Sequence, residues 1–201
     1  MKSLLRGAIM AWAVTISAFA DDLLFKKFDP ANIATTDAQA TANDAILRVV
    51  TGHAQPWPGV RLAAPAGHWD LSAHTEVAAD VKNSGTNPVT VFCRVDNPGA
   101  DGTKHCVTGS VSLQPGQAGT FTVPLKRESG GTLDGKLFGM RGYPVAPDES
   151  GDIDPKNITQ LLFFVNHPAA DHKFEIPQIT ATGSYTPPTR SEERRVGKEC
   201  R

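Results

Sequence analysis

A set of aromatic and arginine side chains has the chemistry needed to recognise a sugar, and its members lie in loops or near the ends of predicted strands. They are Trp57, Arg61, Trp69, Arg94, Arg141 and Tyr143. An aromatic ring packs against the apolar face of a pyranose, and a planar guanidinium donates paired hydrogen bonds to neighbouring hydroxyls. Prolines on both sides of Trp57 favour exposure of its ring. Two members have structural alternatives: Trp69 could pack over the core beside Leu71, and Arg94 could pair with Asp96 or Asp80.

The sequence offers no recognisable catalytic motif. It contains no nucleophile elbow, no metalloprotease helix motif, no phosphate-binding loop and no dinucleotide fingerprint. The acidic pairs Asp148/Glu149 and Asp152/Asp154 lie in a loop rich in Pro and Gly, whereas glycoside hydrolysis needs two carboxyl groups held at a fixed separation. A glycosidase barrel also needs about 250 residues, which is more than the 201 residues of this chain. We therefore expect this chain to have no catalytic residues of its own.

Cys93 and Cys106 lie on two predicted strands that a short loop connects. A hairpin register that opposes Asp96 to Thr103 would place the two cysteines opposite each other, close enough for a disulfide. The alternative is a pair of buried free thiols. No spacing typical of a zinc site is present, so we expect no metal centre and no cofactor. The loop Asp96–Gly102 is rich in oxygen ligands and could hold a structural calcium ion, although a tight turn uses the same residues.

The charge balance argues against two classes of partner. The chain has 201 residues, with 20 Lys and Arg against 21 Asp and Glu, and a formal net charge of -1. Nucleic acids and anionic membranes select clustered basic residues, so neither is expected as a partner. A neutral polymer, a protein or a small molecule remains compatible with this composition.

The first residues have the pattern of a secretory signal peptide. Lys2 and Arg6 precede the apolar stretch 7–17, and Ala18-Phe19-Ala20 is a small-x-small cleavage pattern. The apolar stretch is short for a membrane span, although an uncleaved anchor is the alternative. We expect residues 1–20 to be a signal peptide and the mature protein to be secreted or periplasmic.

The last residues predict a break in the natural sequence. Residues 186–189 (Thr-Pro-Pro-Thr) resemble the start of an interdomain linker. Residues 190–201, when back-translated, resemble a common sequencing adapter read in frame; the alternative is a genuine basic tail. We expect the natural protein to continue beyond Thr189.

Between these ends, apolar residues alternate with polar ones, as in half-buried strands. The predicted strands are Leu23–Phe28, Ala45–Thr51, Val60–Ala63, Glu76–Lys82, Val89–Asp96, His105–Leu113, Gly119–Leu125, Gln160–Asn166 and Lys173–Thr182. Turn sequences rich in Gly, Pro and Asn separate them. Helical hints are limited to Asp37–Asn43 and a turn at Asp70–His74. The pattern predicts an all-β protein, a single jelly-roll-like β-sandwich over residues 21–185.

Several segments of this region resemble a known kind of module. They are Leu47-Arg48-Val49, Trp57-Pro58-Gly59-Val60, His68-Trp69-Asp70-Leu71-Ser72, residues 89–97, Gly139-Met140-Arg141-Gly142-Tyr143-Pro144, residues 158–166 and Phe174-Glu175-Ile176. Over about residues 45–185 the chain is similar to the galactose-binding-like, carbohydrate-binding-module-like jelly rolls that precede the catalytic barrel in bacterial β-agarases and related glycoside hydrolases.

The resemblance implies a role in binding or positioning a galactan such as agarose. Hydrolysis would then belong to a catalytic barrel downstream in the same chain, and the catalytic glutamates of such enzymes have no counterpart here. A structural or adhesion sandwich with no sugar site is the alternative. A free-standing enzyme is a third hypothesis, which would require hydrolysis by this chain alone.

Overall fold

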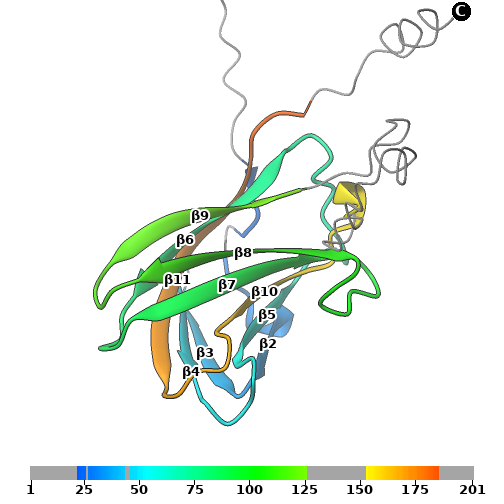
Figure 1. Ribbon diagram of the computed structural model, residues 1–201. Coiled ribbons are helices and arrows are strands. Elements are labelled where there is room, and N and C mark those ends of the chain that lie inside the picture. The colour runs from blue at the N-terminus through cyan, green and yellow to red at the C-terminus, as the bar shows by residue number, and fades with distance from the viewer. Residues whose placement is uncertain (1–21, 26, 44–45, 126–152, 186–201) are drawn as a thin grey trace, which may run out of the picture.

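The computed structural model describes residues 22–25, 27–43, 46–125 and 153–185, which form two antiparallel sheets packed face to face (Figure 1). One sheet has the order β3-β4-β11-β6-β9, with the short strand β1 paired to β11 as its sixth member. The other has the order β2-β5-β10-β7-β8. Both are antiparallel throughout, so the predicted all-β jelly-roll-like sandwich is confirmed.

The bounds of the elements follow the chain. They are β1 (Asp22–Leu23), the 3-10 helix η1 (Pro30–Asn32), β2 (Ile33–Thr36), β3 (Ala38–Asn43), β4 (Ile46–Thr51), β5 (Gly59–Ala63), β6 (Glu76–Asn83), β7 (Val89–Asp96), β8 (Cys106–Leu113), β9 (Ala118–Pro124), the 3-10 helix η2 (Pro155–Asn157), β10 (Gln160–Phe164) and β11 (His172–Thr182). Within the described ranges, no helix is long and apolar enough to cross a membrane.

The core lies between the sheets and is built by strict alternation along the strands. On β7, Val91, Cys93 and Val95 are completely buried, and on β10 Leu161 and Phe163 are as well. The residues between them are only partly buried or, in the case of Asp96, held in a polar network. Successive side chains of a strand point to opposite faces of the sheet. Every second side chain of a strand therefore fills the core, and the side chains between them face outward.

Three sequence-based boundaries need correction. Residues 37–43 do not form a helix: Ala38–Asn43 is strand β3, whose alternating small residues lie over the core while its polar residues face outward. The predicted strand Leu23–Phe28 ends after Leu23, because Phe25 and Phe28 turn into the core, where their rings stack at 5.4 Å. Strand β2 was not predicted, because its sequence has no apolar alternation to mark it.

The predicted disulfide is wrong, and the register of the β7–β8 hairpin gives the reason. Cys93 pairs with Gly109, whereas Cys106 pairs with Asp96. The register therefore differs by three residues from the predicted one, and an odd shift moves a side chain to the other face of the sheet. Cys93 lies on the inner face and Cys106 on the outer face, and both are free thiols.

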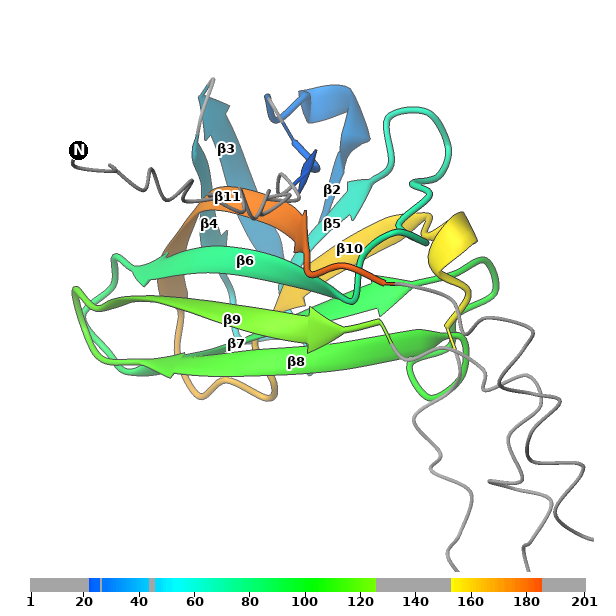
Figure 2. The same cartoon turned by 90° about the horizontal axis from the view of Figure 1, so that it is seen from above.

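One end of the sandwich gathers the β7–β8 loop and η2, as the view from above shows (Figure 2). The buried amide of Asn97 joins them. Its Nδ2 donates to the carbonyls of Asp154 (2.8 Å) and Asn157 (2.7 Å), and its Oδ1 accepts from the Asp154 amide (2.7 Å). This network fixes the loop that follows β7 against the start of β10.

Candidate functional site

Two of the predicted arginines lie in one row on the outer face of the five-stranded sheet. Arg61 of β5 and Arg94 of β7 each lie directly opposite Leu162 of the central strand β10. Their Cα atoms are thus two strand spacings apart, about 10 Å. Arg61 is exposed and the side chain of Arg94 is 20% exposed. Residues separated in sequence therefore share one row across the sheet.

Two phenylalanines form the next row of the same face. Phe92 and Phe164 are paired across β7 and β10, and their rings stack with centroids 5.3 Å apart and planes 15° apart. Gly59 of β5 and Ser110 of β8 flank them on the neighbouring strands, and both rings are partly exposed. The pair forms an apolar platform of the kind that packs against a sugar ring.

Neither phenylalanine was among the predicted site residues, although the sequence contained a signal for Phe92. The side chains of β7 that alternate with the core residues are Thr90, Phe92, Arg94 and Asp96. Phe92 is the one aromatic residue among them, and the other three are polar. The sequence gives no such signal for Phe164, because from Leu161 onward every residue of β10 is apolar, whichever face its side chain occupies. Only the pairing of the two strands shows that the rings meet.

Trp57 extends this face beyond the end of the β5–β10 ladder. The amide of Val165 donates to the Pro58 carbonyl at 3.1 Å, so the two chains still run side by side there. The indole Nε1 of Trp57 donates to Asn166 Oδ1 at 3.1 Å, and the ring meets His167 edge-on at 5.4 Å. Trp57 is 58% exposed. Its ring is therefore held in position while a large part of it faces solvent.

A buried carboxylate fixes the guanidinium of Arg94. Asp96 is fully buried; its Oδ1 accepts from Arg94 Nε at 2.7 Å and its Oδ2 from Arg94 Nη2 at 2.9 Å. Gln160 Nε2 donates to the same Oδ2 at 2.8 Å. Partial burial disfavours the charged form of Arg94, but the hydrogen bonds and the charge of Asp96 outweigh this effect and raise its pKa. Arg94 is therefore a charged donor with a fixed orientation.

We call the outward residues of this region the β5–β10–β7 face. It consists of Trp57, Arg61, Phe92, Arg94, Gln160, Leu162 and Phe164. Aromatic and aliphatic surface lies beside fixed planar donors, which is the combination that sugar recognition requires.

The loop after β7 lies beside Arg94, and Asp101 holds its turn. Asp101 Oδ1 accepts from the Thr103 and Lys104 amides and from the Thr103 hydroxyl. Hydrogen bonds from the Lys104 and Thr103 amides lower the pKa of Asp101 to about 2. Among the described residues, no group of three or more His, Cys, Asp or Glu side chains could hold a metal ion. Asp101 therefore stabilises the turn of this loop.

The other predicted site residues lie elsewhere. Trp69 is partly buried against the core and meets the ring of Phe25 edge-on at 5.3 Å, which agrees with its structural alternative. Its backbone forms an isolated bridge with Ile158, just before β10, while its ring packs against the core and Phe25. Arg141 and Tyr143 lie outside the described residues.

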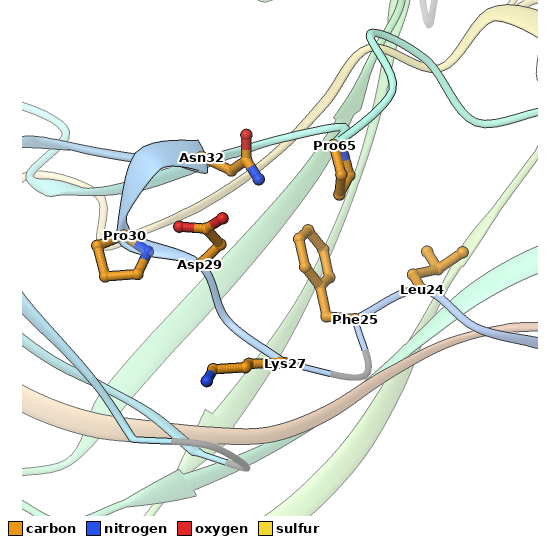
Figure 3. Close-up of a pocket in the computed structure, with 7 residues that line it drawn as sticks. All are labelled: Leu24, Phe25, Lys27, Asp29, Pro30, Asn32 and Pro65. Carbon is orange, nitrogen blue, oxygen red and sulfur yellow. The ribbon is translucent and has the colours of Figure 1, made fainter.

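A hollow of about 610 Å³ lies near the opposite end of β5 from Trp57 (Figure 3). Its lining is formed by Leu24, Phe25, Lys27, Asp29, Pro30, Asn32 and Pro65. The ring of Phe25 points into it, but that side chain is only 7% exposed and packs in the core. Asp29 accepts from the Ala31 amide and caps η1. The hollow therefore offers less accessible aromatic surface than the β5–β10–β7 face.

Comparison with known proteins identifies a curated relative that matches most of this chain. No known protein family profile matches it. Over 174 residues it is 28% identical to Beta-agarase B of Vibrio sp. (strain JT0107), which corresponds to 77% of this chain and 18% of that protein. The chain thus spans less than a fifth of the length of the curated relative that it matches.

Solved structures share its fold. An exo-beta-agarase superposes with a TM-score of 0.57 at 17% identity, over 85% of this chain and 26% of that one. A family 11 carbohydrate-binding module from Clostridium thermocellum, in complex with a beta-1,3-1,4-mixed-linked tetrasaccharide, superposes with a TM-score of 0.53 at 19% identity. In this case 84% of our chain matches 98% of the module. The resemblance to carbohydrate-binding-module-like jelly rolls associated with β-agarases is confirmed.

Proposed function

We propose that this agarase-associated, carbohydrate-binding-module-like jelly roll is a non-catalytic module that binds a polysaccharide through its β5–β10–β7 face. The observation that carries the proposal is the stacked Phe92–Phe164 pair, which lies one row from the fixed guanidinium of Arg94 on a solvent-facing sheet. Apolar platform and directional donors together match the two faces of a pyranose: its C–H surface and its hydroxyl pairs.

The similarity to an agarase supports an agarose-like galactan as the polymer. It also supports a parent enzyme that is a secreted glycoside hydrolase, with its catalytic barrel downstream of residues 186–189. In that arrangement the module binds or positions the polysaccharide for the barrel. The signal peptide at residues 1–20 and a secreted or periplasmic location belong to the same proposal.

Retention of the purified chain on agarose beads tests this function. We expect retention by the unaltered chain and a loss of it in the Phe92→Ala, Phe164→Ala double variant, since both platform rings are removed. Arg48→Gln is the matched control, because Arg48 lies on the opposite sheet, paired with Glu175 at 2.9 Å. Equal retention of all three proteins would contradict the assignment of the face.

The alternative function is a structural or adhesion sandwich without a sugar site. It predicts no retention of the unaltered chain on agarose or on any other polysaccharide. The partly exposed aromatic pair on the outer face, together with the exposed ring of Trp57, favours binding over this alternative, because a purely structural sheet does not need aromatic side chains on its outer face.

A further inference from the structure

The two outer surfaces of the sandwich differ in how their charges are arranged. On the six-stranded sheet, basic and acidic side chains stand together: Arg48 pairs with Glu175, and Lys82 lies opposite Glu175 on the neighbouring strand. On the outer side of the five-stranded sheet, the carboxylates of Asp96 and Asp101 both lie near Arg94, whereas the row of Arg61 contains no acidic residue. Acidic side chains thus accompany Arg94 but not Arg61 on this face.

The two arginines of the face are not equivalent. Arg94 is neutralised by the buried carboxylate of Asp96, which holds two of its nitrogens. Its remaining donors suit uncharged acceptors such as sugar hydroxyls. Arg61 is exposed, and no ion pair joins it to another described residue. Among the described residues, the positive charge of Arg61 therefore has no acidic partner.

We infer that the β5–β10–β7 face binds a polysaccharide with an anionic substituent, an ester sulfate or a carboxylate, and that Arg61 contacts this group. The inference rests on the proposed function. A guanidinium binds planar or tetrahedral oxyanions through paired hydrogen bonds, and Arg61 stands about 10 Å from Arg94 across Leu162. A sugar chain lying across the strands would place one unit over Arg94 and the phenylalanines and direct a substituent on a neighbouring unit to Arg61.

Affinity electrophoresis of the full chain tests the inference, with three probes: neutral agarose, a sulfated galactan and a polymer of uronic acid. Because Arg61 is exposed, the additional contact is expected to strengthen binding of an anionic probe about two- to fivefold over agarose at low salt. Salt above physiological strength should remove this preference. The probe that is preferred identifies the substituent as sulfate or carboxylate.

The decisive variant is Arg61→Gln, with Arg48→Gln as the control of equal charge change on the other sheet. For each variant we compare the affinity for the anionic probe with the affinity for agarose. We expect this ratio to fall to about one in Arg61→Gln, whatever change agarose binding itself shows, while Arg48→Gln keeps the ratio of the unaltered chain. Equal loss of preference in both variants, or no preference in the unaltered chain that still binds agarose, would overturn the inference and leave the proposed function standing. Failure of the unaltered chain to bind any probe would overturn both.

Discussion

Substitution of Gly102 by Ala provides a quantitative test of how the β7–β8 loop holds Arg94. Gly102 has a φ of +98°, a conformation that costs an L-residue about 1–2 kcal/mol. A Cβ at this position would also lie 3.0 Å from Nη1 of Arg94. The far end of an arginine usually moves away at little cost, but this guanidinium is held by two hydrogen bonds to the buried Asp96. The added methyl group must therefore disturb the ion pair or displace the loop.

The size of the effect follows from these two contributions. Backbone strain accounts for about 1–2 kcal/mol, and weakening one hydrogen bond of a partly exposed ion pair adds about 1 kcal/mol. We expect Gly102→Ala to lower the free energy of unfolding by about 2–3 kcal/mol. Gly67→Ala is the matched control, because Gly67 has a φ of +90° and a Cβ added to it would meet no other atom within 4 Å. Strain alone should cost this variant about 1–2 kcal/mol.

Urea unfolding followed by tryptophan fluorescence measures both variants, and retention on agarose measures the consequence for Arg94. We expect Gly102→Ala to be less stable than Gly67→Ala by about 1 kcal/mol and to bind agarose more weakly, since the orientation of Arg94 changes. Equal stability and equal retention of the two variants would refute the contact between Gly102 and Arg94.

Three further predictions concern the core, the thiols and the pH dependence. Phe163→Ala should lower the free energy of unfolding by about 3–5 kcal/mol, because Phe163 is fully buried. Phe164→Ala should lower it by only about 1–2 kcal/mol, because the neighbouring Phe164 faces outward. The reverse order in urea unfolding would show that the two faces of β10 are misassigned. In a variant lacking the third cysteine of the chain, Cys93 and Cys106 should both react with Ellman's reagent after unfolding without reductant. In the native protein Cys93 should stay unreactive, because burial raises the pKa of its thiol. A missing thiol signal after unfolding would indicate a disulfide. Burial lowers the pKa of His172, so the unfolded chain takes up a proton before the folded protein as the pH falls. The free energy of unfolding should therefore decrease below about pH 6.5. His172→Gln should flatten this part of the stability curve, and an unchanged curve would contradict the assignment of this pH dependence to His172.

The strand pattern could be predicted because the core imposes it on the sequence. In β7 and β6 the alternation of buried and outward residues is nearly complete, so the expected segments 89–96 and 76–82 match the strands closely. Residues 38–43 were misjudged because Ala and Gln are good helix formers, and pairing with β4 overrides that preference.

The candidate site was only partly predictable, since it depends on which strands are neighbours. The sequence indicated Trp57, Arg61 and Arg94 by residue type, and the structure places them on one face. The stacking of Phe92 on Phe164 requires β10 to lie beside β7, although more than sixty residues separate the two strands along the chain. Local alternation carries no information about such a pairing. The same limit explains the error in the hairpin register, where the loop length was misjudged by three residues.

The indole N–H signals of Trp57 and Trp69 in an NMR titration with agarose oligosaccharides test the central claim most directly. Trp57 lies on the β5–β10–β7 face with its indole hydrogen-bonded to Asn166, and Trp69 packs against Phe25, which lines the hollow at the other end of β5. Binding at the proposed face should shift the Trp57 signal in a saturable manner and leave that of Trp69 in place. A shift of Trp69 alone, or of neither indole, would contradict the claim that this face binds the polysaccharide.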